Sequence, residues 1–365
     1  MGSIRAGGRQ CPAELECQTP LPATVDEITL EWIQDKLNPH IKSCTPRDTI
    51  VGTATKVILD LEYDDDIEHT DHLPASICVK GGFTADLHSW GTRKAYVREA
   101  DFFARLAHEL DMILPEAYFA ATNTTQGQGI VVLQDLAANK CVFGEVTEPY
   151  TVTQVKSGLE QLARLHGTTW ALKSPETAWL ETADVLRDVM KVLLTDRVWY
   201  GYLTGENALP EFPEHMKDLQ RMKRAFQALW DLSGPQCAIH GDPHVGNTFK
   251  TPRGDVAFLD FQNVQMGASM HDVAYFLTGS LDIEERRQSE RRLLASYLKA
   301  LHSAGGPCLT IDDVWDDYRC HQLHGFLWAF TPPEMQTRER VRAVSLRHFA
   351  AVADHSTLEL LESKR

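Results

Sequence analysis

Two apolar segments of the chain, each leading into a polar turn, decide its fold: AIHGDPHVGN at 238–247 and VAFLDFQ at 256–262. The pattern predicts a strand that ends in a turn bearing Asp242 and Asn247, and a second strand that carries Asp260 to the same end. Phosphoryl transfer requires a carboxylate that orients the attacking hydroxyl and accepts its proton, and oxygen ligands that hold Mg²⁺ on the phosphates. Asp242, Asn247 and Asp260 provide groups of these kinds.

The spacing of these residues, H-x-D-x-x-x-x-N followed by L-D-F-Q, resembles the catalytic motifs of the aminoglycoside phosphotransferase and choline kinase superfamily. It is most similar to the ecdysteroid kinase-like branch, and MHDVAYF at 270–276 resembles the superfamily's D-[LV]-A segment. The resemblance implies an α+β, two-lobed protein-kinase-like fold with a small β-rich N-lobe and a larger, mostly helical C-lobe. It also implies an ATP- and Mg-dependent small-molecule kinase, with Asp242 as base, Asn247 and Asp260 as metal ligands, and His240 bracing the loop.

Two charged residues in the first third of the chain fit the same chemistry. Lys80 ends an apolar segment, and Glu99 follows 19 positions later in a segment with helical spacing. In kinases of this fold, a helix glutamate holds a strand lysine against the α- and β-phosphates. We therefore expect Lys80 and Glu99 to form an ion pair that serves ATP binding, with Glu99 on the first turns of its helix.

Two further segments are candidates for nucleotide contacts. VGTATKV at 51–57 has one glycine where protein kinases have three, so we expect Gly52 and Thr53 to cover the phosphates, with a plain β-turn as the alternative. Gln134 and Asp135 lie in a segment that resembles the hinge between the lobes, where backbone groups receive adenine.

The order of the predicted elements suggests three parts. Residues 1–24 carry no apolar periodicity and are expected to form a flexible tail, followed by a helix capped by Asp26. Residues 25–134, rich in β-branched segments, form the nucleotide-binding N-lobe. Residues 135–365 form the C-lobe with the catalytic loop and the acceptor pocket. Helices are expected there at 152–170, 182–194, 215–232, 284–301 and 311–330.

Composition excludes several classes of partner. The 365 residues carry a formal net charge of −15 without a dense basic run, so neither nucleic acid nor an anionic membrane is an expected partner. The eight cysteines form no C-x-x-C motif, and no segment reaches the length of a membrane span. We expect a reduced, cytoplasmic protein with no obligate protein partner.

The acceptor is expected to be a small hydroxylated molecule. Only 12 positions separate Asp260 from Asp272, which leaves no room for a long activation segment, so a protein substrate is disfavoured. Amino sugars, amino alcohols, sterol-like alcohols and specialised metabolites all remain open as acceptors.

Two other classes of protein compete with the kinase. One is a catalytically inactive nucleotide-binding module of the same fold, which would need no base. The other is a metallohydrolase in which His240, Asp242 and His244 alternate as zinc ligands. A metal could also bind Cys320, His321 and His324, which are expected on one helix, although no fourth ligand is evident.

Overall fold

The computed structural model describes residues 11–65, 73–83, 92–170, 172, 177–180, 185–206 and 208–364. The chain forms two compact units. The first consists of Met1–Val142, Phe249–Arg253 and Leu259–Val264, and the second of Phe143–Thr248, Gly254–Phe258 and Gln265–Arg365. Most of the acidic segment at 64–71, where the sequence predicts a solvated loop between two strands, lies outside the described residues.

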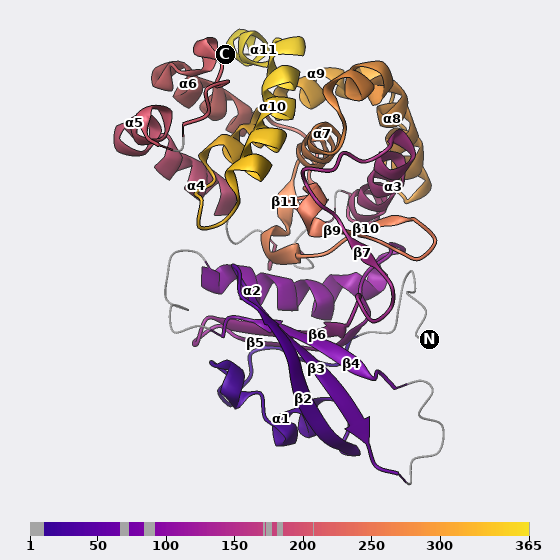
Figure 1. The fold of residues 1–365 in the computed structure, drawn as a ribbon. Helices are drawn as coiled ribbons and strands as arrows, with labels where there is room; N and C mark the ends of the chain where they lie inside the picture. Colours follow the sequence, from indigo (N-terminus) through magenta and orange to yellow (C-terminus); the bar gives the residue numbers. More distant parts are fainter. Residues whose placement is uncertain are drawn as a thin grey trace. The chain divides into compact units, whose positions relative to one another are not determined.

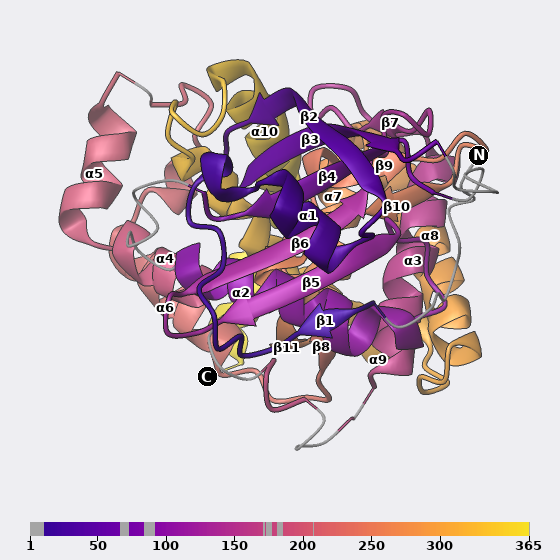
Figure 2. The same cartoon turned by 90° about the horizontal axis from the view of Figure 1, so that it is seen from below.

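The first unit is built on a six-stranded sheet in the order β1-β5-β6-β4-β3-β2. Its strands are β1 (Ala13–Glu14), β2 (Ile41–Ile50), β3 (Thr55–Tyr63), β4 (Ser76–Gly81), β5 (Ala117–Asn123) and β6 (Gln128–Gln134). Strand β1 pairs in parallel with β5, and the other neighbours are antiparallel. Figure 2 shows β1 and β2 at the two edges of the sheet, with α1 in front of it.

Side-chain alternation explains this sheet. In β3, Val57, Leu59 and Leu61 are buried while the residues between them are half-buried, the period of two that a strand imposes. Strand β6 is buried along its whole length. The β-branched residues of β3 and β6 fit the β-rich N-lobe expected at 25–134, whereas the alanines of β5 carry little strand propensity.

The segment before the sheet is ordered from residue 11 onward, contrary to the expected tail over residues 1–24. Cys11 and Leu21 are buried, and β1 adds to the sheet edge. Residues 1–10 lie outside the described part of the chain. The first α-helix, α1 (Leu30–Lys36), is capped by Thr29, whose side chain accepts a hydrogen bond from the Trp32 N–H. Asp26 instead lies in a short 3-10 helix, η1 (Val25–Glu27), so its assignment as the cap was wrong.

Helix α2 (Thr92–Asp101) lies along the face of the sheet opposite α1 (Figure 1). It continues as a π-helix, η3 (Phe102–Leu106), and a 3-10 helix, η4 (Ala107–Glu109). Gly129 on β6 allows the close approach of α2, because a Cβ at that position would lie 2.1 Å from the backbone oxygen of Tyr96. Glu99 therefore lies near the C-terminal end of its helix, and the expectation that it lies on the first turns was wrong.

The second unit is mainly helical. Its helices are α3 (Val152–Thr168), α4 (Val185–Leu193), α5 (Asp196–Thr204), η5 (Glu214–Met216), α6 (Leu219–Trp230), η6 (Val245–Asn247), α7 (Ser269–Ser280), α8 (Ile283–Ser303), α9 (Ile311–His321), η8 (Gln322–Phe330), α10 (Arg338–Asp354) and α11 (Thr357–Ser363). The single helix expected at 311–330 is in fact α9 followed by the 3-10 helix η8. Between β6 and α7 the chain also forms β7 (Val142–Phe143), β8 (Cys237–Ile239), β9 (Thr248–Lys250), β10 (Val256–Phe258), η7 (Phe261–Asn263) and β11 (Gln265–Gly267).

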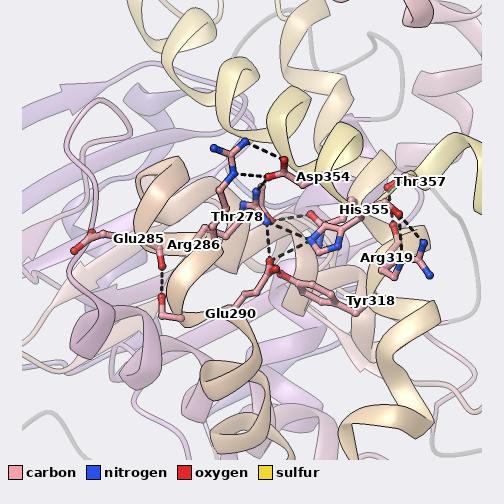
Figure 3. A network of polar contacts seen from close by, with 12 residues as sticks. Thr278, Glu285, Arg286, Glu290, Tyr318, Arg319, Asp354, His355 and Thr357 are labelled. Carbon is pink, nitrogen blue, oxygen red and sulfur yellow. Dashed lines mark hydrogen bonds and ion pairs between the residues drawn. The ribbon is translucent and has the colours of Figure 1, made fainter.

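A buried arginine joins three helices of the second unit (Figure 3). Arg286 on α8 is 1% exposed and donates hydrogen bonds to Asp354 on α10 and to Glu290 on α8, the latter at 2.7 Å. Tyr318 on α9 donates to the same Glu290 oxygen at 3.3 Å, and His355 Nε2 lies 3.1 Å from it. The network supplies partners for a charge that would otherwise be costly to bury. None of the described helices is long and apolar enough to cross a membrane.

Candidate active site

The first unit brings together Lys80 on β4, Glu99 on α2 and Asp260, which follows β10. Lys80 Nζ lies 2.7 Å from Glu99 Oε2 and 3.1 Å from Asp260 Oδ1, and Lys80 and Glu99 are each 3% exposed. Burial alone would lower the pKa of Lys80, but the carboxylates of Asp260 and Glu99 raise it above its ordinary value. Lys80 is therefore a fixed positive charge between two carboxylates.

Asp260 has an unusual backbone conformation. Its φ of 68° and ψ of 64° place it in the left-handed region, which aspartate tolerates better than most residues. The next residue, Phe261, is fully buried and stacks on Phe102 with ring centroids 3.8 Å apart and 6° between the planes. The backbone turn thus buries the phenylalanine against the end of α2 and leaves the Asp260 carboxylate beside Lys80.

The loop between β2 and β3 contains Gly52 and Thr53, as a phosphate-covering loop would. Tyr96 on α2 donates a hydrogen bond to the Thr53 carbonyl at 2.6 Å, which ties the loop to the helix that carries Glu99. A Cβ at position 52 would make only ordinary contact, so the backbone does not require this glycine.

At the end of β6, the side chain of Asp135 serves the protein's own structure. It accepts hydrogen bonds from Arg47, from Ser76 Oγ at 2.9 Å and from the Ala137 N–H at 3.0 Å. Burial would raise the pKa of Asp135, but the hydrogen bonds, led by that from Arg47, hold it below its ordinary value. Beside it, Gln134 Oε1 is buried without a hydrogen-bond partner in the described part of the chain. Gln134 therefore offers an unused acceptor, whereas Asp135 does not.

In the second unit, Asp242 lies in the turn after β8. Tyr275 on α7 donates a hydrogen bond from its hydroxyl to Asp242 Oδ1 at 3.2 Å, and Trp328 Nε1 donates to the Tyr275 oxygen at 2.6 Å. Asn247 Nδ2 donates to the Asp242 carbonyl at 3.0 Å, and His244 Nε2 lies 3.9 Å from Asp242 Oδ2. The amide of Asn247 therefore fixes the turn through its nitrogen, which turns its oxygen away from the Asp242 carbonyl.

The backbone of this turn is held by Asp272, at the start of α7. The carboxylate accepts hydrogen bonds from the N–H groups of His240 at 2.6 Å and Gly241 at 3.0 Å, and His166 Nε2 lies 3.1 Å away. Burial would raise the pKa of Asp272, but the hydrogen bond and charge of His166 lower it. Gly241 has a φ of 83°, so the turn needs a glycine here. The D-[LV]-A aspartate is thus a structural anchor of the turn.

The alternative zinc sites gain no support from the structure. In the described ranges, no three His, Cys, Asp or Glu side chains are grouped as metal ligands. His240 is fully buried, and its Nδ1 accepts the Asp242 N–H at 3.3 Å, as expected for a residue that braces the loop. Cys320 and His321 lie on α9, but His324 lies on the 3-10 helix η8, so these three do not share one regular helix.

A cavity of about 400 Å³ also lies within the second unit, and Asp242 is not among its lining residues. Its walls include Trp170, Trp230, His271, His321 and His324.

Sequence reasoning missed the hydrogen bond from Tyr275 to Asp242 and the one from Trp328 to Tyr275. Tyr275 lies three positions after Asp272, and this spacing places both on one face of α7. Because Asp272 holds the turn, the spacing of three could have indicated that Tyr275 also faces the turn of Asp242.

The fold and these residues define a class, the protein-kinase-like fold of the aminoglycoside phosphotransferase and choline kinase superfamily. Within it, the model of the "Ecdysteroid kinase-like family" matches residues 76–305, and the chain belongs to this family. The family and the fold are those of small-molecule kinases. A search of curated protein sequences returned no match.

Solved structures share the fold at low identity. A microcompartment-associated aminopropanol kinase aligns with 14% identity and a TM-score of 0.50, covering 92% of this chain and 97% of its own. LicA in complex with AMP aligns with 14% identity and a TM-score of 0.50, covering 89% and 96%. Another structure of LicA, the choline kinase from Streptococcus pneumoniae, aligns with 14% identity and a TM-score of 0.49, covering 90% and 99%.

Proposed function

We propose that this protein transfers the γ-phosphoryl group of ATP to a hydroxyl group of a small-molecule metabolite. The observation that carries the proposal is the buried ion pair of Lys80 and Glu99, with the half-buried Asp260 beside it. A lysine that is nearly inaccessible to solvent and fixed by a helix carboxylate is suited to neutralise phosphate oxygens. A protein that did not bind phosphates would gain little from burying this ion pair, because desolvation opposes it.

The nucleotide fits two features of the first unit. The orphaned Gln134 Oε1 can accept a hydrogen bond from an exocyclic amino group such as that of adenine. The loop at Gly52 and Thr53, held by Tyr96, is placed at the β2–β3 turn, where kinases of this fold cover the phosphates. Both assignments are part of the proposal.

The metal assignment rests on the chemistry of its donors. Asn247 and Asp260 offer an amide and a carboxylate oxygen, the hard ligands that Mg²⁺ prefers, and the nucleotide phosphates and water would complete the shell. When bound, Mg²⁺ would neutralise charge on the phosphates. The ion pair of Lys80 with Asp260 Oδ1 holds this carboxylate in place.

Asp242 is proposed as the base. Its carboxylate would accept the proton of the acceptor hydroxyl while orienting the oxygen for attack. The turn that carries it is fixed by Asp272 and by the amide of Asn247, so little reorganisation would be needed in the transition state.

The test is an ATP-consumption screen over hydroxylated metabolites, grouped as amino sugars, amino alcohols, sterol-like alcohols and specialised metabolites. Mass spectrometry would detect the added phosphoryl group. With an acceptor in hand, Asp242→Asn should lower turnover by about 10²- to 10⁴-fold and leave Mg-ATP affinity unchanged. The exposed Asp312→Asn serves as the matched control. Near-normal turnover of Asp242→Asn would sink this mechanism, and ATP binding without any product would favour the inactive module.

A further inference from the structure

The carboxylate of Asp242 is the end of a short chain of hydrogen bonds that begins at an indole. Trp328 Nε1 lies 2.6 Å from the Tyr275 hydroxyl oxygen, and that hydroxyl lies 3.2 Å from Asp242 Oδ1. An indole N–H can only donate, so it donates to the tyrosine oxygen, and the tyrosine hydrogen is left to point at the carboxylate. The direction of the chain is therefore fixed by chemistry.

Helix α7 holds the turn of Asp242 at two levels. One is the backbone, through Asp272, and the other is the side chain, through Tyr275, three positions further along the same helix. Tyr275 and Trp328 are 3% and 5% exposed, so both donors are shielded from bulk water, whereas the Asp242 side chain is 26% exposed. A buried phenol hydroxyl that makes two hydrogen bonds has little freedom to rotate, so its donor direction is fixed.

We propose that Tyr275, with Trp328 behind it, is a positioning residue for the reaction: the pair fixes the orientation of the Asp242 carboxylate that accepts the proton. The proposal rests on the function proposed above, in which Asp242 is the base. Oδ1 accepts the hydrogen bond of the phenol, whereas Oδ2 accepts one from Asn247 Nδ2 at 3.5 Å and lies 3.9 Å from His244 Nε2.

The surroundings of Tyr275 support a donor that stays protonated. Burial, together with the nearby Asp242 charge, raises the pKa of Tyr275 well above its ordinary value. The rings of His324 and His348 pack against it at centroid distances of 5.1 and 5.4 Å. Burial lowers the pKa of both imidazoles, that of His348 to about 3, so they add no positive charge beside the phenol.

Three variants separate positioning from simple stability. Tyr275→Phe removes the donor to Asp242 and also leaves the buried Trp328 N–H without an acceptor. The double variant Tyr275→Phe/Trp328→Phe removes both polar groups, so it leaves no indole N–H buried without an acceptor. The matched control is Tyr318→Phe, which deletes another buried phenol that donates to a carboxylate, Glu290 at 3.3 Å, within the network of Figure 3.

For turnover, we expect kcat to fall about ten- to hundredfold in Tyr275→Phe and to stay low in the double variant, with KM for ATP unchanged. Thermal stability should fall in Tyr275→Phe and recover at least partly in the double variant. Tyr318→Phe should lose stability but keep kcat. Recovery of kcat together with stability in the double variant would overturn the proposal.

A second measurement needs no acceptor. In protein labelled with ¹³C-aspartate, the Asp242 carboxyl signal can be assigned by its absence in Asp242→Asn. Loss of the phenol donor should change the chemical shift of this carboxyl carbon at neutral pH in Tyr275→Phe, because Oδ1 loses its hydrogen bond, whereas Tyr318→Phe should leave the shift unchanged. An identical chemical shift in the wild type and Tyr275→Phe would overturn the proposal. If Asp242→Asn itself keeps full turnover, the assignment of Asp242 as the base fails; if only Tyr275→Phe keeps it, the positioning role alone fails.

Discussion

The backbone N–H of Phe261 donates a hydrogen bond to Oε1 of Glu99 at 3.2 Å, across 162 positions of sequence. Glu99 Oε2 meanwhile binds Lys80. The two oxygens of one carboxylate thus hold the lysine of the sheet and the segment that bears Asp260. The helix, the strand and the segment after β10 are joined at this single side chain.

It follows that Lys80 and Glu99 should behave as one unit. Lys80→Ala and Glu99→Ala should each weaken Mg-ATP binding by about tenfold or more, and each should lower the free energy of unfolding by about 3 kcal/mol, as for a broken buried ion pair. In Glu99→Ala, Lys80 keeps Asp260 as a partner, so the double variant should lose little beyond the worse single one. Calorimetric titration and urea unfolding measure both quantities. Strictly additive losses would contradict the pairing.

Asp260 should make ATP binding depend on Mg²⁺. We expect the wild type to bind ATP far more tightly with Mg²⁺ than with EDTA, and Asp260→Ala to lose most of this difference because a metal ligand is gone. Asp260→Asn is the matched variant, since asparagine also tolerates the left-handed backbone at φ 68°. Equal affinity with and without Mg²⁺ in all three proteins would remove the metal assignment.

Asp272→Asn should loosen the turn of Asp242. The asparagine has one acceptor oxygen for the two N–H groups of His240 and Gly241, so one of them loses its partner. We expect a loss of roughly 2–4 kcal/mol in the free energy of unfolding, together with slower turnover. Chemical denaturation and kinetics check this, with the exposed Asp312→Asn as control. A variant as stable as the wild type would show that the turn does not depend on this carboxylate.

The network of Figure 3 predicts a pH dependence of stability. Burial would raise the pKa of Glu290, but His355 and Arg286 lower it below its ordinary value. A depressed folded-state pKa contributes stability that is present above the unfolded pKa, about 4.3, and is lost as pH falls through the folded value. Glu290→Gln should therefore cost about 3 kcal/mol at pH 7 and progressively less in acid.

The control for that experiment is Glu284→Gln, because Glu284 is 72% exposed and pairs with Arg287 on the surface of α8. It should change stability little at any pH. A constant difference between Glu290→Gln and wild type from pH 7 to pH 3 would contradict the prediction.

The sequence predicted the parts of this protein whose chemistry is local. The β-branched segments within residues 25–134 indicated a β-rich first lobe, and the spacing of Asp242 to Asn247 marked the turn after β8. Lys80 and Glu99 were paired because of their distance along the chain, although the helix register of Glu99 was wrong. That register depends on where α2 begins and on its contact with β6, which a single sequence does not reveal.

Other features depend on contacts between distant segments. Asp135 is predicted at the hinge, where backbone groups would receive adenine, but the sequence does not reveal that its side chain binds Arg47, from a strand 88 positions earlier. Trp328 reaches Tyr275 across 53 positions from a 3-10 helix that helical periodicity does not predict. Strand β1 is two residues long and is defined only by its pairing with β5.

Gly129 has a consequence for mutational surveys of this chain. It contacts neither Lys80 nor Glu99 in the ion pair, yet any side chain there would meet the backbone of α2 one turn before Glu99. Substitution would push the helix outward and lengthen the reach from its carboxylate to the lysine. The absence of a side chain at position 129 thus sets the distance between α2 and β6. A random mutational screen for activity should find substitutions of Gly129 as damaging as those of Lys80 and Glu99.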